Sequence, residues 1–559
     1  MTENNFKLTT LPYKRVTIES FEEKGRKLIE EFKNAKSGEE QFLIHKKYYE
    51  LKKESYTAMV LSRLRHDGNV VDKFYEDENN YYNEVSPKFT AIENEYKKEL
   101  FNSKFRTFLE EKIGKIAFKD IEYSLKAFDK SIINLKQEEN ALSAEYVKLL
   151  AQVKINFKGE ELNMSLLGKY TQSKDRDVRI EAIKAKSLEL EKIADKLDDI
   201  YDKLVKNRTE QAKKLGYENY VTLGYYRMGR TTYGIEEVRN FRNQVKKYLV
   251  PFATKLHDNR RKRLGIDKLD SVDEGVYFKE GNPVPVGTSK EILEQGQKMY
   301  AELSKETKEF FDFMMDHELF DVFGRTNKAG GGYMDMLFTY KSPIIFANFN
   351  GTSGDVDVIT HESGHAFQGF ITRDYEIMEH NDIKMETAET HSMSMEFFTD
   401  NWMELFYGDR ADDCRKMKLE DAIAFIPYGC MVDEFQEIVY SKPELTPAER
   451  REVWKKLEKE YKPHLRYDND KFQGEGRRWQ IQRHIYKSPF YYIDYALAQT
   501  CALQFKIKMD ENYEDAWNKY LAFAKESAKD TFTNMLHHVG LKSPFEEGYM
   551  EELVGKLDK

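Results

Sequence analysis

The feature that most constrains this chain is the pentad HESGH at residues 361–365. If the segment is an α-helix, in which each residue turns by about 100°, His361 and His365 lie on one face with Glu362 beside them. Two imidazoles at this spacing can reach one tetrahedral Zn²⁺, and the carboxylate can reach a water on the metal. The motif therefore predicts a zinc site suited to metal-assisted hydrolysis of an amide bond.

The residues around the pentad predict that its helix is buried. Apolar residues precede and follow it at helical spacing, namely Val356, Val358, Ile359, Ala366, Phe367 and Phe370. The alternative is a surface helix with two exposed histidines and a solvated glutamate. Buried groups that can carry charge need partners, and a metal ion supplies one, so the context favours the metal site.

The bulk composition limits the class of protein. The chain has 559 residues, of which 33% are charged and 40% hydrophobic, and this predicts a globular, helix-rich protein. A formal net charge of −9 argues against nucleic acid or an anionic membrane as partner, and no apolar stretch approaches a membrane-spanning length. Cys414, Cys430 and Cys501 are far apart, as expected for reduced thiols, so we expect a cytoplasmic protein.

The periodicity of the sequence separates helical segments from one strand-rich segment. Residues 17–230 and 240–320 keep apolar residues at helical spacing, and this pattern resumes after Asp382. Between them, Lys328–Gly351 is poor in charge and rich in aromatic and β-branched residues, which predicts short strands with glycine turns. We expect the backbone of Ile344–Asn348 to pair with an extended peptide. A purely structural hairpin is the alternative.

A catalytic zinc site needs a third protein ligand. The segment Lys384–Phe398, KMETAETHSMSMEFF, contains several acidic residues at helical spacing beside apolar neighbours. At least one carboxylate there should be buried, and zinc would satisfy it. Spacing alone leaves Glu386 and Glu389 open as the ligand, and ordinary surface glutamates remain the alternative.

The combination of HESGHAFQ with ETAETHSMSMEFF resembles the oligoendopeptidase F branch of the thimet-oligopeptidase family of zinc metallopeptidases. Four further segments are similar to Pz-peptidase-like oligoendopeptidases. They are GYENYVTLGYYRMGRTTYG from Gly216, DEGVYFKEGNPVPVG from Asp273, SPIIFANFNGTSGDVDVIT from Ser342 and WQIQRHIYKSPFYYIDYALAQ from Trp479. The resemblance covers most of the chain from about residue 200. It departs from the mammalian branch at Gln368, which is not a ligand position in the family.

The resemblance implies roles for individual residues. It places the third zinc ligand at Glu389 and a supporting acid at Glu396, and it assigns His391 no ligand role. In the C-terminal segment it implies that His484 and Tyr495 stabilise the oxyanion of the transition state. The segment's dense aromatic residues would otherwise be interpreted as core.

The resemblance also implies substrate contacts at four positions. Tyr491 and Tyr492 are expected to help at the substrate, and the choice among Tyr491, Tyr492 and Tyr495 as the essential phenol stays open. The strand Ile344–Asn348 contributes Ala347, and the glycine-rich turn from Gly330 contributes Gly332. As a lone glycine cluster, that turn indicates no more than a tight bend.

Together these observations predict a mostly α, two-lobed helical zincin of the gluzincin type, with a small β-sheet beside the zinc helix and a deep central channel. Residues 1–200 would form a helical region that covers the channel, and residues 201–559 the catalytic region. The expected function is a zinc metalloendopeptidase with one Zn²⁺ per chain, Glu362 as general base and short peptides as substrates. The alternatives are a metallocarboxypeptidase of related fold and a peptide-binding protein without turnover. The sequence leaves the oligomeric state open.

Overall fold

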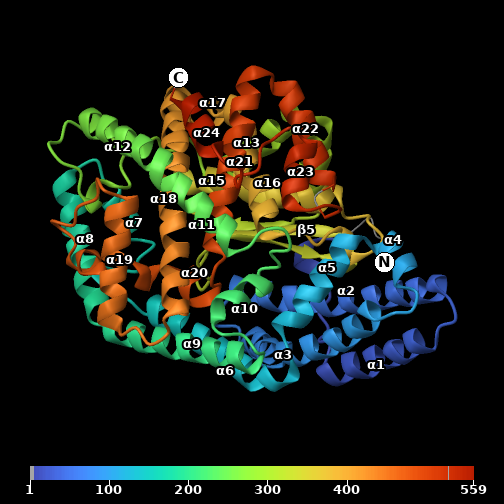
Figure 1. Ribbon diagram of the computed structural model, residues 1–559. Helices are drawn as coiled ribbons and strands as arrows, with labels where there is room; N and C mark the ends of the chain where they lie inside the picture. Colours follow the sequence, from blue (N-terminus) through green and yellow to red (C-terminus); the bar gives the residue numbers. More distant parts are fainter. Residues whose placement is uncertain (1–5, 527, 559) are drawn as a thin grey trace.

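The computed structural model describes residues 6–526 and 528–558 and is built mainly of α-helices (Figure 1). In the N-terminal half the principal helices are α1 (Ile18–Asn34), α2 (Gly38–Gly68), α3 (Lys73–Phe101), α4 (Arg106–Ile113), α5 (Lys115–Ala127), α6 (Ile133–Ala151), α8 (Arg176–Glu191), α9 (Ala194–Lys214), α10 (Tyr220–Arg227), α11 (Ile235–Gln244) and α12 (Val250–Leu264). They are followed by α13 (Ser289–Leu303), α14 (Lys305–Asp316), α15 (Ser353–Ile371), α16 (Met385–Phe398), α18 (Ala411–Ser441), α19 (Pro447–Tyr461), α20 (Arg483–Lys487), α21 (Tyr492–Glu511), α22 (Tyr513–Glu526), α23 (Phe532–His538) and α24 (Tyr549–Leu557).

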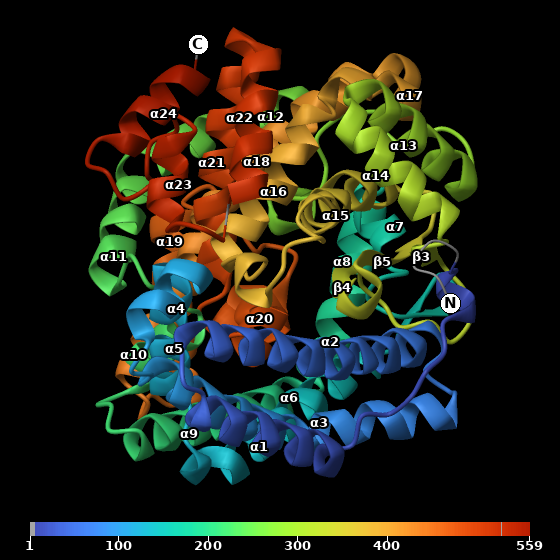
Figure 2. The ribbon, with the colours of Figure 1, turned by 90° about the vertical axis from the view of Figure 1, so that its right-hand side faces the viewer.

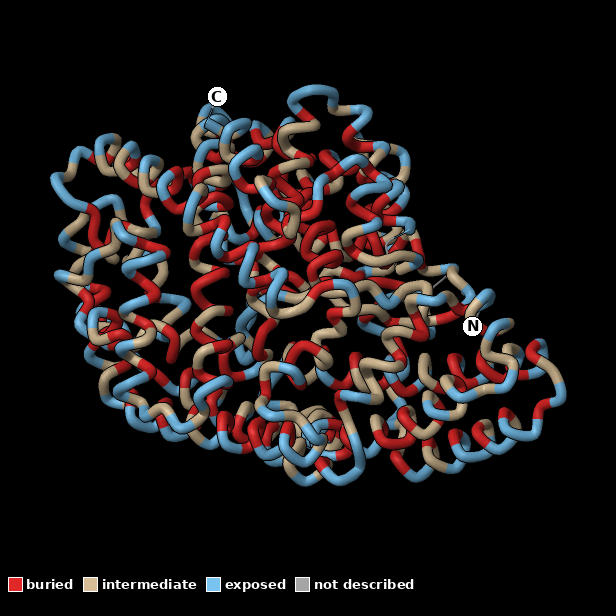
Figure 3. Tube along the Cα trace, in the orientation of Figure 1, coloured by how far each residue is buried: buried red, intermediate tan, exposed pale blue. Residues whose placement is uncertain are grey.

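The helices form two lobes. Helices α1, α2, α3, α6 and α9 lie along one side of the molecule, and α15, α16, α18, α21 and α22 lie opposite them (Figures 1 and 2). Buried residues follow the inward faces of the helices and exposed residues the outward faces (Figure 3). The expected mostly α, two-lobed fold is confirmed. The division after residue 200 stays a prediction.

A small mixed sheet lies beside α15. Its strands are β3 (Phe320–Phe323), β4 (Tyr333–Leu337) and β5 (Ser342–Phe349), in the order β3-β5-β4. Strand β5 pairs in parallel with β3 and antiparallel with β4. A second, two-stranded sheet is a short hairpin of β1 (Ile155–Phe157) and β2 (Glu160–Leu162), which was not predicted from the sequence.

The strand order corrects one expectation. Strand β5 contains Ile344–Asn348, which we expected to pair with a peptide, but its two edges are already paired with β3 and β4. Ala347 is only 1% exposed in this central strand. Strands β3 and β4 form the two edges of this sheet, so their backbones, and not that of β5, are available for augmentation by an extended peptide.

The turn between β5 and α15 fixes where the helix begins. Asp355, in the first turn of α15, accepts hydrogen bonds from the backbone N–H groups of Asn350 and Gly351. Gly351 has φ of 79°, which favours glycine. The side chains of Val356, Ile359, Ala366, Phe367 and Phe370 are buried, as the apolar pattern predicted, whereas Val358 is only half-buried. This packing holds the HESGH segment against the core.

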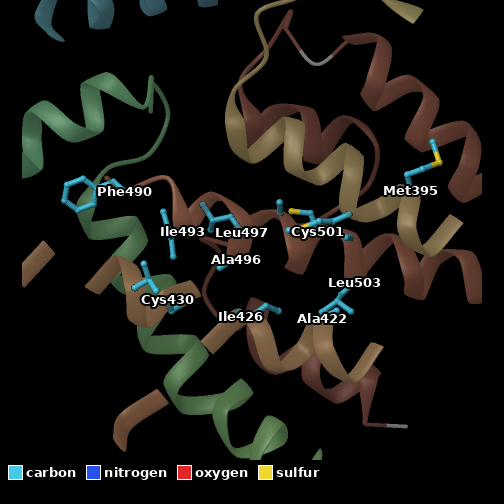
Figure 4. Close-up of a cluster of buried hydrophobic side chains, with 14 of the residues drawn as sticks. Met395, Ala422, Ile426, Cys430, Phe490, Ile493, Ala496, Leu497, Cys501 and Leu503 are labelled. Carbon is cyan, nitrogen blue, oxygen red and sulfur yellow. The ribbon is translucent and has the colours of Figure 1, made fainter. Parts of the chain in front are cut away.

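Helix α21 lies in the lobe that contains α15 and packs against α16 and α18. Figure 4 shows part of this core, where Ile493, Ala496 and Leu497 of α21 lie beside Ile426 and Cys430 of α18. A central helix that is apolar on most of its faces gives the polar residues at its first turn a fixed position. The three cysteines are buried and do not form disulfides.

Candidate active site

His361, His365 and Glu389 converge at the junction of α15 and α16. One ligand atom from each residue lies within 4.8 Å of the other two. A carboxylate oxygen of Glu389 is 3.5 Å from Nε2 of His361 and 3.5 Å from Nε2 of His365. Ligand atoms that share one tetrahedral Zn²⁺ lie about 3.4 Å apart, given Zn–N and Zn–O distances near 2.1 Å. The donor set and its spacing therefore fit this ion.

The hydrogen bonding of His361 also favours a cation between these groups. Its Nδ1 lies 2.7 Å from Oε1 of Glu396, so Nδ1 carries the proton and donates it to that carboxylate. Nε2 points toward the Glu389 carboxylate, so either a proton on Nε2 or a bound metal ion must lie between these two groups. Glu396 was expected as a supporting acid, and its contact with His361 gives that expectation a geometric basis.

The charges of the ligand group are strongly coupled. Burial alone would raise the pKa of Glu389, which is 2% exposed, but the two imidazoles outweigh burial and lower this pKa well below its usual range. Burial opposes protonation of His361, yet its hydrogen bonds to Glu389 and Glu396 raise its pKa. In each case the protein favours an anionic carboxylate next to positive charge, which is the electrostatic environment that a bound cation provides.

A close approach of two backbones brings the ligands together. A Cβ atom at Gly364 would lie only 2.6 Å from Cα of Ser392 and 3.0 Å from the backbone oxygen of His391. Only glycine lets α15 and α16 approach this closely. Sequence reasoning treated Gly364 as one of the two variable positions of the motif, because the contact involves a helix that follows later in the chain.

The structure separates the two glutamates that spacing left open. Glu386 is buried and does not belong to the ligand group, and burial together with the nearby Asp494 raises its pKa to about 8. Glu389 reaches both histidines. His391 is fully buried, and burial lowers its pKa to about 3.

Tyr491 supports the ligand carboxylate directly. Its hydroxyl donates a hydrogen bond of 2.5 Å to Oε1 of Glu389. Burial and the neighbouring Glu389 charge raise the pKa of Tyr491, so its hydroxyl remains protonated. Tyr491 was expected at the substrate, and this contact places it first at the metal-binding group. The residue before it, Phe490, has φ of 67°, an uncommon conformation that turns the chain into α21.

A cavity of about 400 Å³ opens beside the ligand group. His361, Glu362 and His365 line it, and so do Gly332 and, from β4, Tyr333, Met334 and Met336. Tyr56 of α2, whose hydroxyl donates to Asp335 of β4 at 3.2 Å, also lines it, so residues of both lobes border the cavity. Glu362 thus faces the same space as the ligand atoms and the edge strand. Ala347 is not among the residues that line this cavity.

His484 lies at the start of α20 and has a defined tautomer. Tyr428 donates its hydroxyl proton to Oε1 of Gln482 at 2.8 Å, and Nε2 of Gln482 lies 3.0 Å from Nδ1 of His484. The amide therefore donates to Nδ1, and the imidazole proton resides on Nε2. Burial lowers the pKa of His484 to about 4, so the ring is neutral at neutral pH. Sequence reasoning missed Tyr428 and Gln482.

Tyr495 stands between two cavities. It lines the cavity with the ligand group and a second one of about 500 Å³, which His484 and Tyr492 also line. The ring centroids of His484 and Tyr495 are 5.6 Å apart, and those of Tyr491 and Tyr495 are 4.9 Å apart. Burial and the nearby Glu389 raise the pKa of Tyr495, so it is a hydrogen-bond donor. Glu396, which contacts His361, also lines the second cavity.

Comparison with known proteins extends this description. Residues 8–128 match the Peptidase M3 N-terminal domain, and residues 293–554 match Peptidase family M3. A solved structure of Pz peptidase A with an inhibitor is 44% identical, covers 99% of this chain and 98% of its own, and has a TM-score of 0.96. A Bacillus anthracis structure assigned as oligoendopeptidase F is 41% identical with the same coverage and a TM-score of 0.92.

Other comparisons add less. Oligoendopeptidase F from Enterococcus faecium is 15% identical with a TM-score of 0.61 and shares the fold. No curated protein sequence matches the chain. Within residues 6–526 and 528–558, no helix has both the length and the apolar character needed to cross a bilayer.

Proposed function

The chain belongs to peptidase family M3 and is a metalloendopeptidase, and we propose that it hydrolyses internal bonds of short peptides at a Zn²⁺ site formed by His361, His365 and Glu389. The observation that carries the proposal is the convergence of these three donors beside Glu362 in one interlobe cavity. A Zn²⁺ ion held there would polarise the scissile carbonyl and acidify a water molecule.

The residues of the chain divide the remaining work. Glu362 accepts the proton of the attacking water and returns it to the leaving amine, and its position beside the ligand histidines suits this role. The Nε2–H group of His484 and the hydroxyl of Tyr495 are neutral donors, and we assign them to the developing oxyanion. Tyr491 and Glu396 hold Glu389 and His361 in position.

The substrate is proposed to lie along β4. An extended peptide can hydrogen-bond to the free edge of this strand, with Gly332 leaving room for its backbone. The cavity has a volume of about 400 Å³, so an extended segment fits and a folded domain does not. Tyr492 lines the second cavity, where it would contact the part of the peptide beyond Tyr495.

The experiment combines metal analysis with product mapping. Purified protein is assayed for zinc content, and cleavage of a quenched fluorogenic peptide with both ends blocked is followed before and after chelation. We expect one Zn²⁺ per chain, internal cleavage of the blocked peptide, and loss of cleavage on chelation with recovery on zinc addition. Cleavage confined to peptides with a free C-terminus would indicate a carboxypeptidase instead, and binding without turnover a peptide-binding protein.

A further inference from the structure

A third cavity, of about 530 Å³, adjoins the catalytic cavity. Helices α3 and α5 of the N-terminal lobe form much of its wall, and the segment 378–385 that leads into α16 forms another part. Ile383 and Met385 line both this cavity and the catalytic one. A peptide that extends past this segment would therefore enter the third cavity, which we call the distal cavity.

The walls of the distal cavity carry charge of both signs, and most of it is paired. Lys384 pairs with Asp120 at 2.9 Å, Lys52 with Glu93 at 3.4 Å, Lys136 with Glu139 at 2.8 Å, Arg227 with Glu139 at 3.4 Å, and Glu379 with His45 at 3.1 Å. Asp382 is exposed at the rim. Among the described residues, Lys97 lines the cavity without a carboxylate at ion-pair distance.

Lys97 belongs to a short hydrogen-bonded chain that ends in an unused donor. Its Nζ donates to Oγ of Ser124 at 2.8 Å, and Ser124 donates to Oδ1 of Asn94 at 3.4 Å. Nδ2 of Asn94 has no hydrogen-bond partner within the described part of the chain, although Asn94 is only 4% exposed and lines the cavity. A buried amide donor without an acceptor is costly, so the site has an unmet requirement for an acceptor.

We propose that the distal cavity is a subsite for a carboxylate of the peptide substrate, which accepts hydrogen bonds from Lys97 and Asn94. This inference rests on the proposed function, because the carboxylate arrives on a peptide held in the catalytic cavity. A carboxylate is the group that matches a cation next to an amide donor, since it accepts several charge-assisted hydrogen bonds. It can come from an Asp or Glu side chain or from the C-terminus of the peptide.

The electrostatics of the empty cavity agree with this ligand. Burial, with a contribution from the neighbouring Lys52, lowers the pKa of Lys97. A carboxylate next to Lys97 would favour its charged form again and would replace the water that a lysine otherwise needs. The ion-paired residues on the other walls would keep their partners, because the carboxylate needs only the amide of Asn94 and the ammonium group of Lys97, which has no carboxylate partner.

The test uses fluorogenic peptides that share one cleavable core, and in the first two series both ends of the peptide are blocked. In one series Glu is placed at successive positions on the N-terminal side of the core, in a second series on the C-terminal side, and each has a Gln counterpart. A third pair ends in a free carboxylate or an amide. We expect kcat/KM for one carboxylate position to exceed that of its neutral counterpart by about tenfold or more, the scale of a charge-assisted hydrogen bond. The series that responds identifies the source of the carboxylate.

Two variants and a matched control assign the effect. Lys97→Met and Asn94→Asp should each abolish the preference for the carboxylate peptide, the first by removing the cation and the second by adding a repelling charge. Both should cleave the short core peptide at the wild-type rate. Lys98→Met, at the exposed neighbour on α3, should keep the preference.

The outcomes separate this inference from the proposed function. Absence of cleavage of the core peptide by the wild-type protein would contradict the proposed function. Normal cleavage of the core without any preference for a carboxylate, or a preference that survives in Lys97→Met or in Asn94→Asp, would overturn the distal subsite. Circular dichroism melting of each variant shows whether it has folded, and either variant alone is sufficient for the test.

Discussion

The α15–α16 wall of the catalytic cavity is held by backbone contact, whereas the α20–α21 wall, which lies between this cavity and the second one, is held by side-chain hydrogen bonds. On the first wall, Gly364 lies directly against Ser392, so the ligand atoms have little freedom. On the second, His484 depends on Gln482 and Tyr428. We therefore expect a substitution in the first wall to remove all metal binding at once. A substitution in the second wall should remove one hydrogen bond and lower the turnover rate only in part.

The largest effect should come from Gly364→Ala. The new Cβ would overlap the backbone of α16, so α16 must move and Glu389 must leave the histidines. We expect bound zinc and activity to be lost together, with a lower melting temperature, measured by elemental analysis, peptide cleavage and calorimetry. Gly555→Ala is the control, since its Cβ meets open space on an exposed helix. A Gly364→Ala variant with full zinc content would show that the two helices can separate.

The next effect is expected for Glu362→Gln. The amide keeps the size of the side chain but cannot accept the proton of water, so kcat should fall by about 10²-fold to 10⁴-fold. Zinc content and peptide binding should remain, because Glu362 is not a ligand in this arrangement. Elemental analysis, calorimetric titration with a peptide and steady-state kinetics measure the three quantities. Near-normal turnover would remove Glu362 from the mechanism.

Tyr495→Phe tests the second wall. Loss of one oxyanion donor should lower kcat by about 10²-fold to 10³-fold with little change in KM. The fold and zinc content should survive, because only a hydroxyl is removed. Tyr492→Phe serves as the comparison and should retain most of its activity, since Tyr492 lines the second cavity without lining the first. If Tyr492→Phe loses activity while Tyr495→Phe keeps it, the roles of the two residues must be exchanged.

Tyr491→Phe tests a residue that connects the two walls. The side chain of Tyr491 extends from the start of α21 to Glu389 on α16. Removal of its hydrogen bond to Glu389 should weaken zinc binding by about 10-fold to 100-fold, the range for groups that support metal ligands. Competition with a chelator of known affinity measures the change. At saturating zinc, kcat should be closer to wild type than that of Tyr495→Phe. Unchanged zinc affinity would indicate that Glu389 needs no support from Tyr491.

The smallest effect is expected for Gln482→Leu. Without the amide donor, Nδ1 of His484 loses the partner that fixes its tautomer, whereas the burial that lowers the pKa of His484 to about 4 remains. The proton of the neutral ring can then occupy Nδ1 instead of Nε2, so a fraction of the molecules lacks the Nε2–H donor. At neutral pH we expect about a tenfold loss of kcat. A kcat identical to wild type at neutral pH would contradict the proposed tautomer.

The sequence predicted those parts of the molecule that depend on local spacing. The HESGH pattern and its apolar neighbours identified α15, its buried face and the two histidines. Glu389 required either the resemblance or the structure, because its pairing with α15 depends on how two helices pack. The expectation that Ile344–Asn348 pairs with a peptide was wrong for the same reason: only the three-dimensional pairing decides which strand lies at an edge of the sheet. Gly364 and Tyr428 contact residues that are distant in the sequence, and the contact of Gln482 with His484 depends on side-chain conformation, so no motif indicated these three residues.

The position of Tyr495 between two cavities has a consequence for product release. If the scissile bond lies beside this ring, the two halves of a cleaved peptide occupy different cavities. Each half then leaves by its own route, and either one can remain bound while the other departs. We therefore expect the two products to inhibit the enzyme with different kinetic patterns, and the slower departure to set the turnover rate for long substrates.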